Sequence, residues 1–353
     1  MKAAVIGCGR MGAGPSSRLA GRLPQGWLPH SHVEALIAAG GFELALCDSD
    51  AGLLDTRATE YGVARRDTDF RRLLDDVRPE LVTIATRTPP KADIVHAACD
   101  AGARAIYVEK PFATNLQTCQ DLLARMREAG VIAAYGVNRR YHSTFRLAQR
   151  LVADGAVGTV TEVVVEPDYS AQLMWSHPHS VDTLMFFAAS TSVERVRARF
   201  APGSVSREGD MIDCDPLLQT AVFEFANGVT GHIARAGGSN VRIAGARGAL
   251  TIFGNGAAIH LNRPGHGEDR EDVRIDPPPP CASAMTTAFA ELAEVIAGTA
   301  AANPLTLGAD MIETGTRMLL ACAWSDVNGQ QFVDPGSVPS TLTVTGRFNS
   351  LYP

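Results

Sequence analysis

The stretch that decides the fold is AAVIGCGRMG, residues 3–12. Four apolar residues lead directly into a turn with the pattern G-x-G-x-x-G. Glycines at this spacing permit a tight turn and let the backbone approach a pyrophosphate, which binds at the start of a helix. A strand that ends in such a turn predicts a dinucleotide-binding site. We expect five residues of the turn to contact the cofactor: Gly7, Gly9, Arg10, Met11 and Gly12.

The first third of the chain alternates short apolar runs with helical patterns. The apolar runs after the first are FELALCD (42–48), LVTIAT (81–86), RAIYVE (104–109) and VIAAYGV (131–137). Strands separated by helices of this length predict a parallel sheet with both faces covered. We therefore expect a Rossmann domain over residues 1–137. Residues 13–31 are too rich in Pro and Gly to continue a helix, and we interpret them as an inserted loop near the cofactor, with a lid over the site as one interpretation.

The hydrophobicity pattern of the sequence changes after Asn138. Longer runs with alternating hydrophobicity follow, and Asn227-Gly228 between two of them predicts a β-hairpin. These patterns predict a second domain, residues 138–353, built on an antiparallel or mixed sheet. The whole chain is therefore expected to be an α/β protein of two domains.

Composition narrows the class of protein. The 353 residues carry a formal charge of −6, which argues against nucleic acid as the main partner. We find no run of about 18 apolar residues, so no membrane span is expected. The first residues are too quickly interrupted by glycines to form a signal peptide. The seven cysteines are widely spaced and form no CxxC pair, which predicts reduced thiols in a cytoplasmic protein.

Asp48 ends the second predicted strand. In a dinucleotide-binding fold a carboxylate at this place accepts hydrogen bonds from the adenosine ribose and repels a 2′-phosphate, which favours NAD over NADP. The alternative is a turn-forming aspartate, because Asp is common in turns. Arg10 can steady an adenine or a phosphate, so NADP stays open.

The run RAIYVE ends in Glu109, Lys110 and Pro111. Ligands of a parallel dinucleotide-binding sheet bind outside the carboxyl ends of its strands. A lysine at such an end can reach both the nicotinamide side and the substrate, where it stabilises developing negative charge. The alternative is an ion pair at the surface of a strand end.

These motifs together resemble the Gfo/Idh/MocA oxidoreductases, the family of glucose-fructose oxidoreductase and inositol dehydrogenases. The resemblance rests on GCGRMG (7–12), EKP (109–111), GVNRRY (136–141) and DGAVGTVTEV (154–163). It implies that the second domain is an α+β domain with a large open, mainly antiparallel sheet. The inner face of that sheet closes the active site, and its outer face forms a homodimer or homotetramer. The resemblance also implies that Thr86, Arg87, Glu109, Lys110 and Asn138 border the cofactor. Arg139 is expected either to border the substrate pocket or to be a solvated charge at the domain junction.

Members of this family usually carry D-x-G-x-H-x-x-D on the helix that faces the lysine. The matching stretch here is MWSHPHSVDTLMFF, residues 174–187, in which His179 and Asp182 take the last two positions. The resemblance implies that His179 exchanges a proton with the substrate and that Asp182 holds a hydroxyl or the histidine. Trp175 replaces the first aspartate and offers a flat apolar face for a sugar ring or for packing. His177, which replaces the glycine, either fills a polar pocket or caps a helix.

The pair His177 and His179 can also be interpreted as metal ligands. No third ligand stands at a recognisable spacing, so no metal is predicted. The favoured function is an NAD(P)-dependent oxidoreductase that transfers hydride to or from a hydroxyl-bearing carbon of a sugar, cyclitol, amino sugar or related small molecule. One alternative is an enzyme that retains NAD and performs elimination or glycoside cleavage without net redox change. Another is a non-catalytic sensor that binds a dinucleotide.

Overall fold

The computed structural model describes residues 1–353 except 168–171, 206, 266–268, 278, 304–307 and 347–353. The chain forms two compact units. Unit 1 comprises Met1–Phe112, Thr118–Tyr141 and Pro280–Ala309, and unit 2 comprises Ala113–Gln117, His142–Pro279 and Asp310–Pro353. The units are therefore not two consecutive blocks of sequence, because a segment from the second half of the chain packs into unit 1.

Unit 1 contains a sheet of six parallel strands in the order β3-β2-β1-β4-β5-β6, which confirms the predicted Rossmann-type sheet. The strands are β1 Lys2–Ile6, β2 Glu43–Cys47, β3 Arg65–Asp67, β4 Leu81–Ile84, β5 Ala105–Val108 and β6 Ile132–Tyr135. Ile6 pairs with Ile84, and Ile84 pairs with Val108. The segments that follow β1, β4 and β5 therefore leave the sheet at one edge. The strand order reverses between β1 and β4, which is where ligands of such sheets bind.

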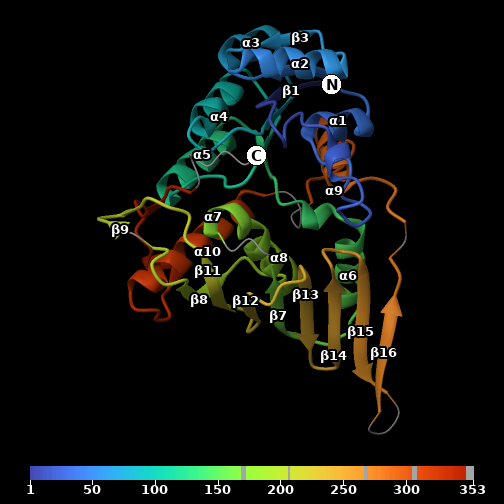
Figure 1. The fold of residues 1–353 in the computed structure, drawn as a ribbon, viewed down its shortest axis with the longest axis vertical. Helices are drawn as coiled ribbons and strands as arrows, with labels where there is room; N and C mark the ends of the chain where they lie inside the picture. Colours follow the sequence, from blue (N-terminus) through green and yellow to red (C-terminus); the bar gives the residue numbers. More distant parts are fainter. Residues whose placement is uncertain (168–171, 206, 266–268, 278, 304–307, 347–353) are drawn as a thin grey trace. The chain divides into compact units, whose positions relative to one another are not determined.

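Helices cover this sheet (Figure 1). They are α1 His32–Ala39, α2 Ala51–Tyr61, α3 Phe70–Val77, α4 Lys91–Asp100, α5 Leu116–Glu128 and α9 Ala284–Ala297, with short 3-10 helices η1 Ser16–Leu19 and η2 Asn138–Tyr141. Several helix ends follow from local chemistry. The Asp50 side chain caps α2 by accepting from the Leu53 amide, and Ser283 caps α9 by accepting from Thr286. Helix α9 packs beside α1 although the two are far apart in sequence (Figure 1).

Unit 2 is built on a sheet of eight strands in the order β16-β15-β14-β13-β7-β12-β11-β8. Its strands are β7 Val160–Glu166, β8 Val193–Phe200, β11 Leu218–Phe225, β12 Thr230–Ala234, β13 Asn240–Gly245, β14 Gly248–Phe253, β15 Ala258–Pro264 and β16 Arg270–Ile275. Neighbouring strands are antiparallel except β7 and β12, so the sheet is mainly antiparallel, as expected. Strands β11 and β12 form the hairpin that Asn227-Gly228 predicts.

One face of the large sheet is packed against helices of unit 2. Helix α6 contacts β14, and helix α8 contacts β7 and β12. Strand β11 alternates buried and partly exposed residues along its length, as a strand covered on one face does. The remaining elements of unit 2 are α6 Ser143–Ala153, α7 Leu173–Ser176, α8 Pro178–Ala188, α10 Ala309–Val327, η3 Pro335–Ser337 and a small sheet of β9 Arg207–Glu208, β10 Met211–Ile212 and β17 Thr343–Val344.

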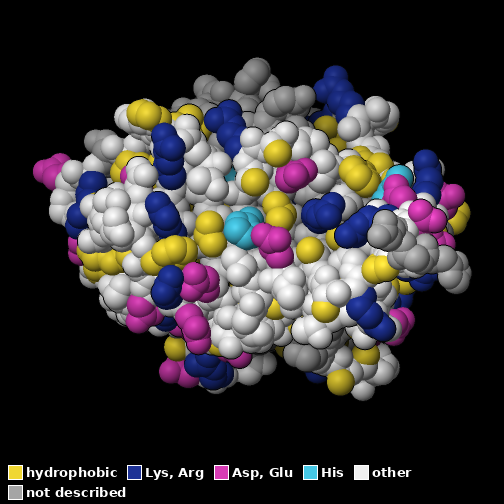
Figure 2. Space-filling view, turned by 90° about the horizontal axis from the view of Figure 1, so that it is seen from below, with side chains coloured by type: hydrophobic (Ala, Val, Ile, Leu, Met, Phe, Trp, Pro, Cys, Tyr) yellow, Lys and Arg dark blue, Asp and Glu magenta, His cyan; other side chains and the backbone are white. Residues whose placement is uncertain are grey.

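The surface seen in Figure 2 mixes side-chain types. Lys and Arg side chains lie among Asp, Glu and hydrophobic ones over that face. Among the described residues, no helix combines the length and hydrophobicity that crossing a bilayer requires.

Candidate functional site: a dinucleotide cradle and a buried ionic cluster

The three glycines of the first turn lie in different surroundings. Gly7 has a φ of +96°, and a Cβ added there would lie 2.8 Å from the backbone of Ala85. A Cβ on Gly12 would lie 1.7 Å from the carbonyl oxygen of Gly7. A Cβ on Gly9 would meet no other atom within 4 Å. The first and third glycines are thus required by the packing of the protein itself, and the second leaves room for a ligand to approach the backbone, as a dinucleotide pyrophosphate does.

The first helix after β1 is interrupted by the inserted loop. The amides of Ala13 and Gly14 donate to the Gly9 carbonyl at 3.0 and 2.9 Å, which closes one helical turn. The chain then leaves, and α1 begins 18 residues later with His32 and Val33 donating to the carbonyls of Met11 and Gly12 at 2.8 and 2.9 Å. The first amides of α1 are thus already hydrogen-bonded to those carbonyls. An anion would therefore bind at the helical turn that begins at Gly9.

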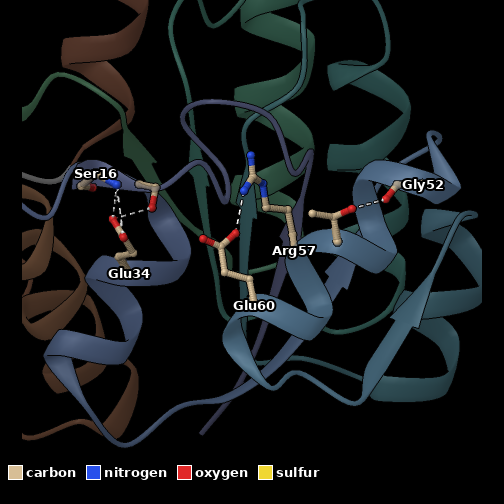
Figure 3. A network of polar contacts seen from close by, with 7 residues as sticks. Ser16, Glu34, Gly52, Arg57 and Glu60 are labelled. Atoms are coloured by element: carbon tan, nitrogen blue, oxygen red, sulfur yellow. Dashed lines mark hydrogen bonds and ion pairs between the residues drawn. The ribbon is translucent and has the colours of Figure 1, made fainter. Parts of the chain in front are cut away.

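The inserted loop is held against both neighbouring helices of unit 1. The Glu34 carboxylate of α1 accepts from the Ser16 amide at 3.0 and 3.2 Å and from the Ser31 hydroxyl at 3.1 Å (Figure 3). The carbonyl of Gly26 accepts from the Ala284 amide at the start of α9, at 2.8 Å. Trp27 is buried, with 7% of its surface exposed. The loop is therefore part of the packed structure of unit 1.

Asp48 ties the second strand to the glycine turn. Its Oδ2 accepts from the Cys8 amide at 2.6 Å, and its Oδ1 accepts from the Asp50 amide at 3.0 Å. The carboxylate thus lies beside the cradle at the place where a ribose is expected. Its contact with the ribose stays a prediction.

Basic side chains gather near the same turn. Arg18 from the inserted loop donates to the carbonyl oxygen of Arg10 at 2.8 Å. Partial burial and the nearby guanidinium groups of Arg10 and Arg57 lower the pKa of Arg18. Arg57 lies on α2 and pairs with Glu60 at 2.6 Å (Figure 3). Positive charge beside the open position at Gly9 suits a phosphate-bearing ligand.

The loop after β4 presents a buried hydroxyl. Thr86 lies two residues beyond Ile84, the last residue of the strand, and its Oγ1 is buried without a hydrogen-bond partner. A buried hydroxyl in this state is costly unless something satisfies it. Because it lies at the switch point of the sheet, a polar group of a bound cofactor would satisfy it. The glycine cradle and this hydroxyl together fit a dinucleotide.

Glu109, the residue after β5, is buried inside unit 1 with 5% of its surface exposed. Its Oε1 lies 3.3 Å from His32 Nε2, and Gly136 is so close that an added Cβ would lie 2.8 Å from the carboxylate. Burial alone would raise the pKa of Glu109, but the hydrogen bond from His32 and the charges of His32, Lys110 and Lys91 hold that pKa below its usual value. The carboxylate is therefore a buried anion among cations. Its expected contact with the cofactor stays a prediction.

An aromatic and polar layer lies beneath Glu109. The His32 ring packs edge-on against Tyr107 and Phe289, with centroids 5.2 and 5.6 Å apart. Tyr107 donates its hydroxyl to Asn138 Oδ1 at 2.7 Å, and Asn138 is 5% exposed. Asn138 is thus fixed within unit 1, next to Arg139 in η2. Sequence reasoning did not find His32 or Phe289, because these residues reach this edge on α1 and α9, from segments distant in sequence from Glu109.

In unit 2, the structure places the other candidates on two successive short helices. Trp175 lies on α7, whose first amides are capped by Asp215, which accepts from Met174 at 2.7 Å and from Trp175 at 3.1 Å. His179 and Asp182 lie one turn apart on α8, so they share a face of that helix. Asp182 is 3% exposed, whereas His179 is half-buried.

His177 has a different environment from His179. It is fully buried at the junction of α7 and α8, and its Nδ1 lies 3.2 Å from Ser180 Oγ. This is the polar pocket that one interpretation of the sequence allowed for it. Over the described part of the chain, no group of three His, Cys, Asp or Glu side chains is placed to hold a metal ion.

The strand order of unit 1 and the cradle at its switch point define a Rossmann dinucleotide-binding protein. The family described as "Oxidoreductase family, NAD-binding Rossmann fold" matches residues 1–137. This match covers 137 of the 353 residues and agrees with the resemblance of the chain to the Gfo/Idh/MocA oxidoreductases.

The similar proteins include dehydrogenases of sugars and cyclitols. D-apiose dehydrogenase of Paraburkholderia graminis is 32% identical over 135 residues, which cover 38% of this chain and 36% of that protein. The scyllo-inositol 2-dehydrogenase (NAD(+)) of Bacillus subtilis is 27% identical over 160 residues, covering 45% of this chain and 42% of that one. This chain thus matches less than half the length of these two relatives.

Solved structures share the fold over nearly the whole chain. An oxidoreductase from Agrobacterium radiobacter, solved with NAD+, L-tartaric acid and magnesium, superposes with a TM-score of 0.73. The match covers 96% of this chain and 99% of that one at 18% sequence identity. At this identity the likeness establishes the fold alone.

Proposed function

We propose that the chain is an NAD(P)-dependent dehydrogenase or reductase that acts on a CH–OH carbon of a sugar, cyclitol, amino sugar or related small molecule. The observation that carries the proposal is the open position at Gly9, flanked by the crowded Gly7 and Gly12 at the switch point of a parallel sheet. The names of the sugar and inositol dehydrogenases among its relatives support the substrate class.

Each candidate residue has a proposed task. Nicotinamide, when bound, supplies the acceptor or donor of hydride. Lys110, at the carboxyl edge of the sheet, holds the substrate oxygen and stabilises negative charge on it. His179 takes the hydroxyl proton or returns it, since imidazole titrates near neutral pH. Asp182 binds a hydroxyl or orients His179, and Trp175 and Arg139 border the substrate.

The cofactor is proposed to be NAD in preference to NADP. The Asp48 carboxylate, fixed by the Cys8 and Asp50 amides, would repel a 2′-phosphate. The arginines near Gly9 compensate charge on a pyrophosphate, which both cofactors carry. A comparison of NADH and NADPH affinities tests this preference.

The deciding experiment follows absorbance at 340 nm with purified protein, either cofactor and a panel of sugars and cyclitols. The variant Lys110→Met is expected to lose turnover and to keep its affinity for NADH. Lys2→Met is the matched control, because Lys2 lies at the opposite end of the sheet and donates to the Val77 carbonyl. Unchanged turnover in Lys110→Met would remove this mechanism. Product formed without a net change in NADH would assign the chain to chemistry that retains its cofactor.

The protein is also proposed to form a homodimer or homotetramer through its large sheet. Side chains that the helices do not cover include the pair His232 and Glu162, 2.9 Å apart on neighbouring strands β12 and β7. Light scattering of the purified protein measures the mass. A monomer at all concentrations would contradict the proposal.

A further inference from the structure

Lys91 is a buried lysine beneath the turn that carries Lys110. It is the first residue of α4, and 1% of its surface is exposed. Its Nζ donates to the backbone carbonyl of Glu109 and, at 2.6 Å, to the backbone carbonyl of Pro111. These two carbonyls belong to the residues immediately before and after Lys110. One side chain thus holds the main chain on both sides of the lysine proposed to contact substrate.

Such burial is unfavourable for a lysine unless its head group is bound. The two carbonyl oxygens satisfy it, and bonds from an ammonium group are stronger than bonds from a neutral donor. Burial lowers the pKa of Lys91 to about 7, with the Glu109 carboxylate acting to raise that pKa and the charge of Lys110 acting to lower it. The Glu109 carboxylate is in turn bound to His32. Lys91 and Lys110 are therefore close enough to influence each other electrostatically.

Lysine is rare in this chain, which makes the proximity of Lys91 and Lys110 unusual. The sequence has only three lysines, at positions 2, 91 and 110, against 29 arginines. Lys110 follows β5, and the Lys91 head group reaches the same turn from the start of α4. A compact ammonium group fits between two backbone carbonyls in a closed space, whereas a planar guanidinium does not.

We propose that Lys91 is a positioning residue: it binds the carbonyls on both sides of Lys110 and so sets the direction in which the Lys110 side chain leaves the strand. This inference rests on the function proposed for Lys110. The competing interpretation is that Lys91 only stabilises the fold, and the two differ in what happens to Lys110 when Lys91 is replaced.

The kinetic test compares Lys91→Met with Lys91→Gln. Lys91→Met removes every donor and is expected to lower kcat by about 10- to 100-fold, since small misplacements of a reacting group have effects of this size. The dissociation constant for NADH should change by less than about threefold, because the cradle at Gly9 is elsewhere on the edge. Lys91→Gln keeps an N–H donor and should recover part of kcat. If Lys91→Met does not fold, Lys91→Gln carries the comparison.

A second measurement is independent of turnover. Protein labelled with 13C at lysine Cε should give three signals, from Lys2, Lys91 and Lys110. The signal lost in Lys91→Gln identifies Lys91, which should titrate near neutral pH in the wild type. The Lys110 signal should move in Lys91→Gln and stay unchanged in Lys2→Met.

The outcomes separate the two proposals. A Lys110 signal that does not move, or a folded Lys91→Met with kcat within twofold of wild type, would overturn the positioning role. An equal loss of NADH affinity and kcat would also overturn it, as a structural role predicts. If Lys110→Met keeps its turnover, the proposed function fails, and the Lys110 signal still reports whether Lys91 orients that side chain.

Discussion

Replacing Gly9 and Gly12 by alanine, one at a time, tests the dinucleotide cradle, because the two sites differ sharply in free space. In Gly12→Ala the new Cβ would lie 1.7 Å from the Gly7 carbonyl oxygen, whereas ordinary contacts begin at 3.4 Å, so the backbone must move by about 1.7 Å. Overpacking of this kind costs ~1–3 kcal/mol or more. In Gly9→Ala the methyl meets nothing within 4 Å, and restriction of the unfolded chain should stabilise the fold by roughly 0.4–1 kcal/mol.

Affinity for the cofactor should respond differently. The methyl of Gly9→Ala stands in the space proposed for the pyrophosphate, so the dissociation constant for NADH should rise at least ~10-fold, or ~1.4 kcal/mol. Urea unfolding followed by tryptophan fluorescence measures stability, and NADH fluorescence measures binding. Gly9→Ala should therefore be stable and bind poorly, and Gly12→Ala should be unstable. The reasoning is refuted if Gly9→Ala binds NADH as the wild type does, or if it loses as much stability as Gly12→Ala.

Three further predictions concern stability and cofactor choice. Because burial lowers the pKa of Lys91 from 10.5 to about 7, the unfolded chain binds a proton between these pH values that the folded chain does not. Unfolding free energy should therefore rise with pH from 7 to 10 by up to roughly 4 kcal/mol in the wild type relative to Lys91→Met, and the same pH dependence of unfolding free energy in both proteins would contradict this. Asp48→Ser should raise the NADPH-to-NADH affinity ratio by about 10-fold, as fluorescence titration would show, and an unchanged ratio would leave Asp48 as a turn residue. Trp27→Ala should lose ~3–5 kcal/mol of unfolding free energy by urea denaturation, since that side chain belongs to the inserted loop and is buried, and a loss below ~1 kcal/mol would mean that the loop is not anchored.

Local chemistry made features of both units predictable. The run that ends at Gly7 forms β1, and the alternation of strands and helices up to residue 137 forms the parallel sheet. The β11–β12 hairpin turns at Asn227-Gly228, where Gly228 takes a φ of +84° that glycine adopts without strain. Each of these features depends on residues within a few positions of one another. The same locality placed Lys110 at a strand end, whereas the helix that carries His179 was expected from the family resemblance.

Residues far apart in sequence meet only through tertiary structure, and sequence patterns did not predict these contacts. Lys91, the first residue of α4, donates to the Glu109 and Pro111 carbonyls, which lie about 20 positions further along the chain, after β5. In the same way, the Ser283 side chain caps α9 locally, but the place of α9 beside α1 in unit 1 depends on contacts between distant segments. The physical reason is that helix and turn formation depend on neighbouring residues, whereas burial and perturbed ionisation depend on which distant surfaces exclude water together.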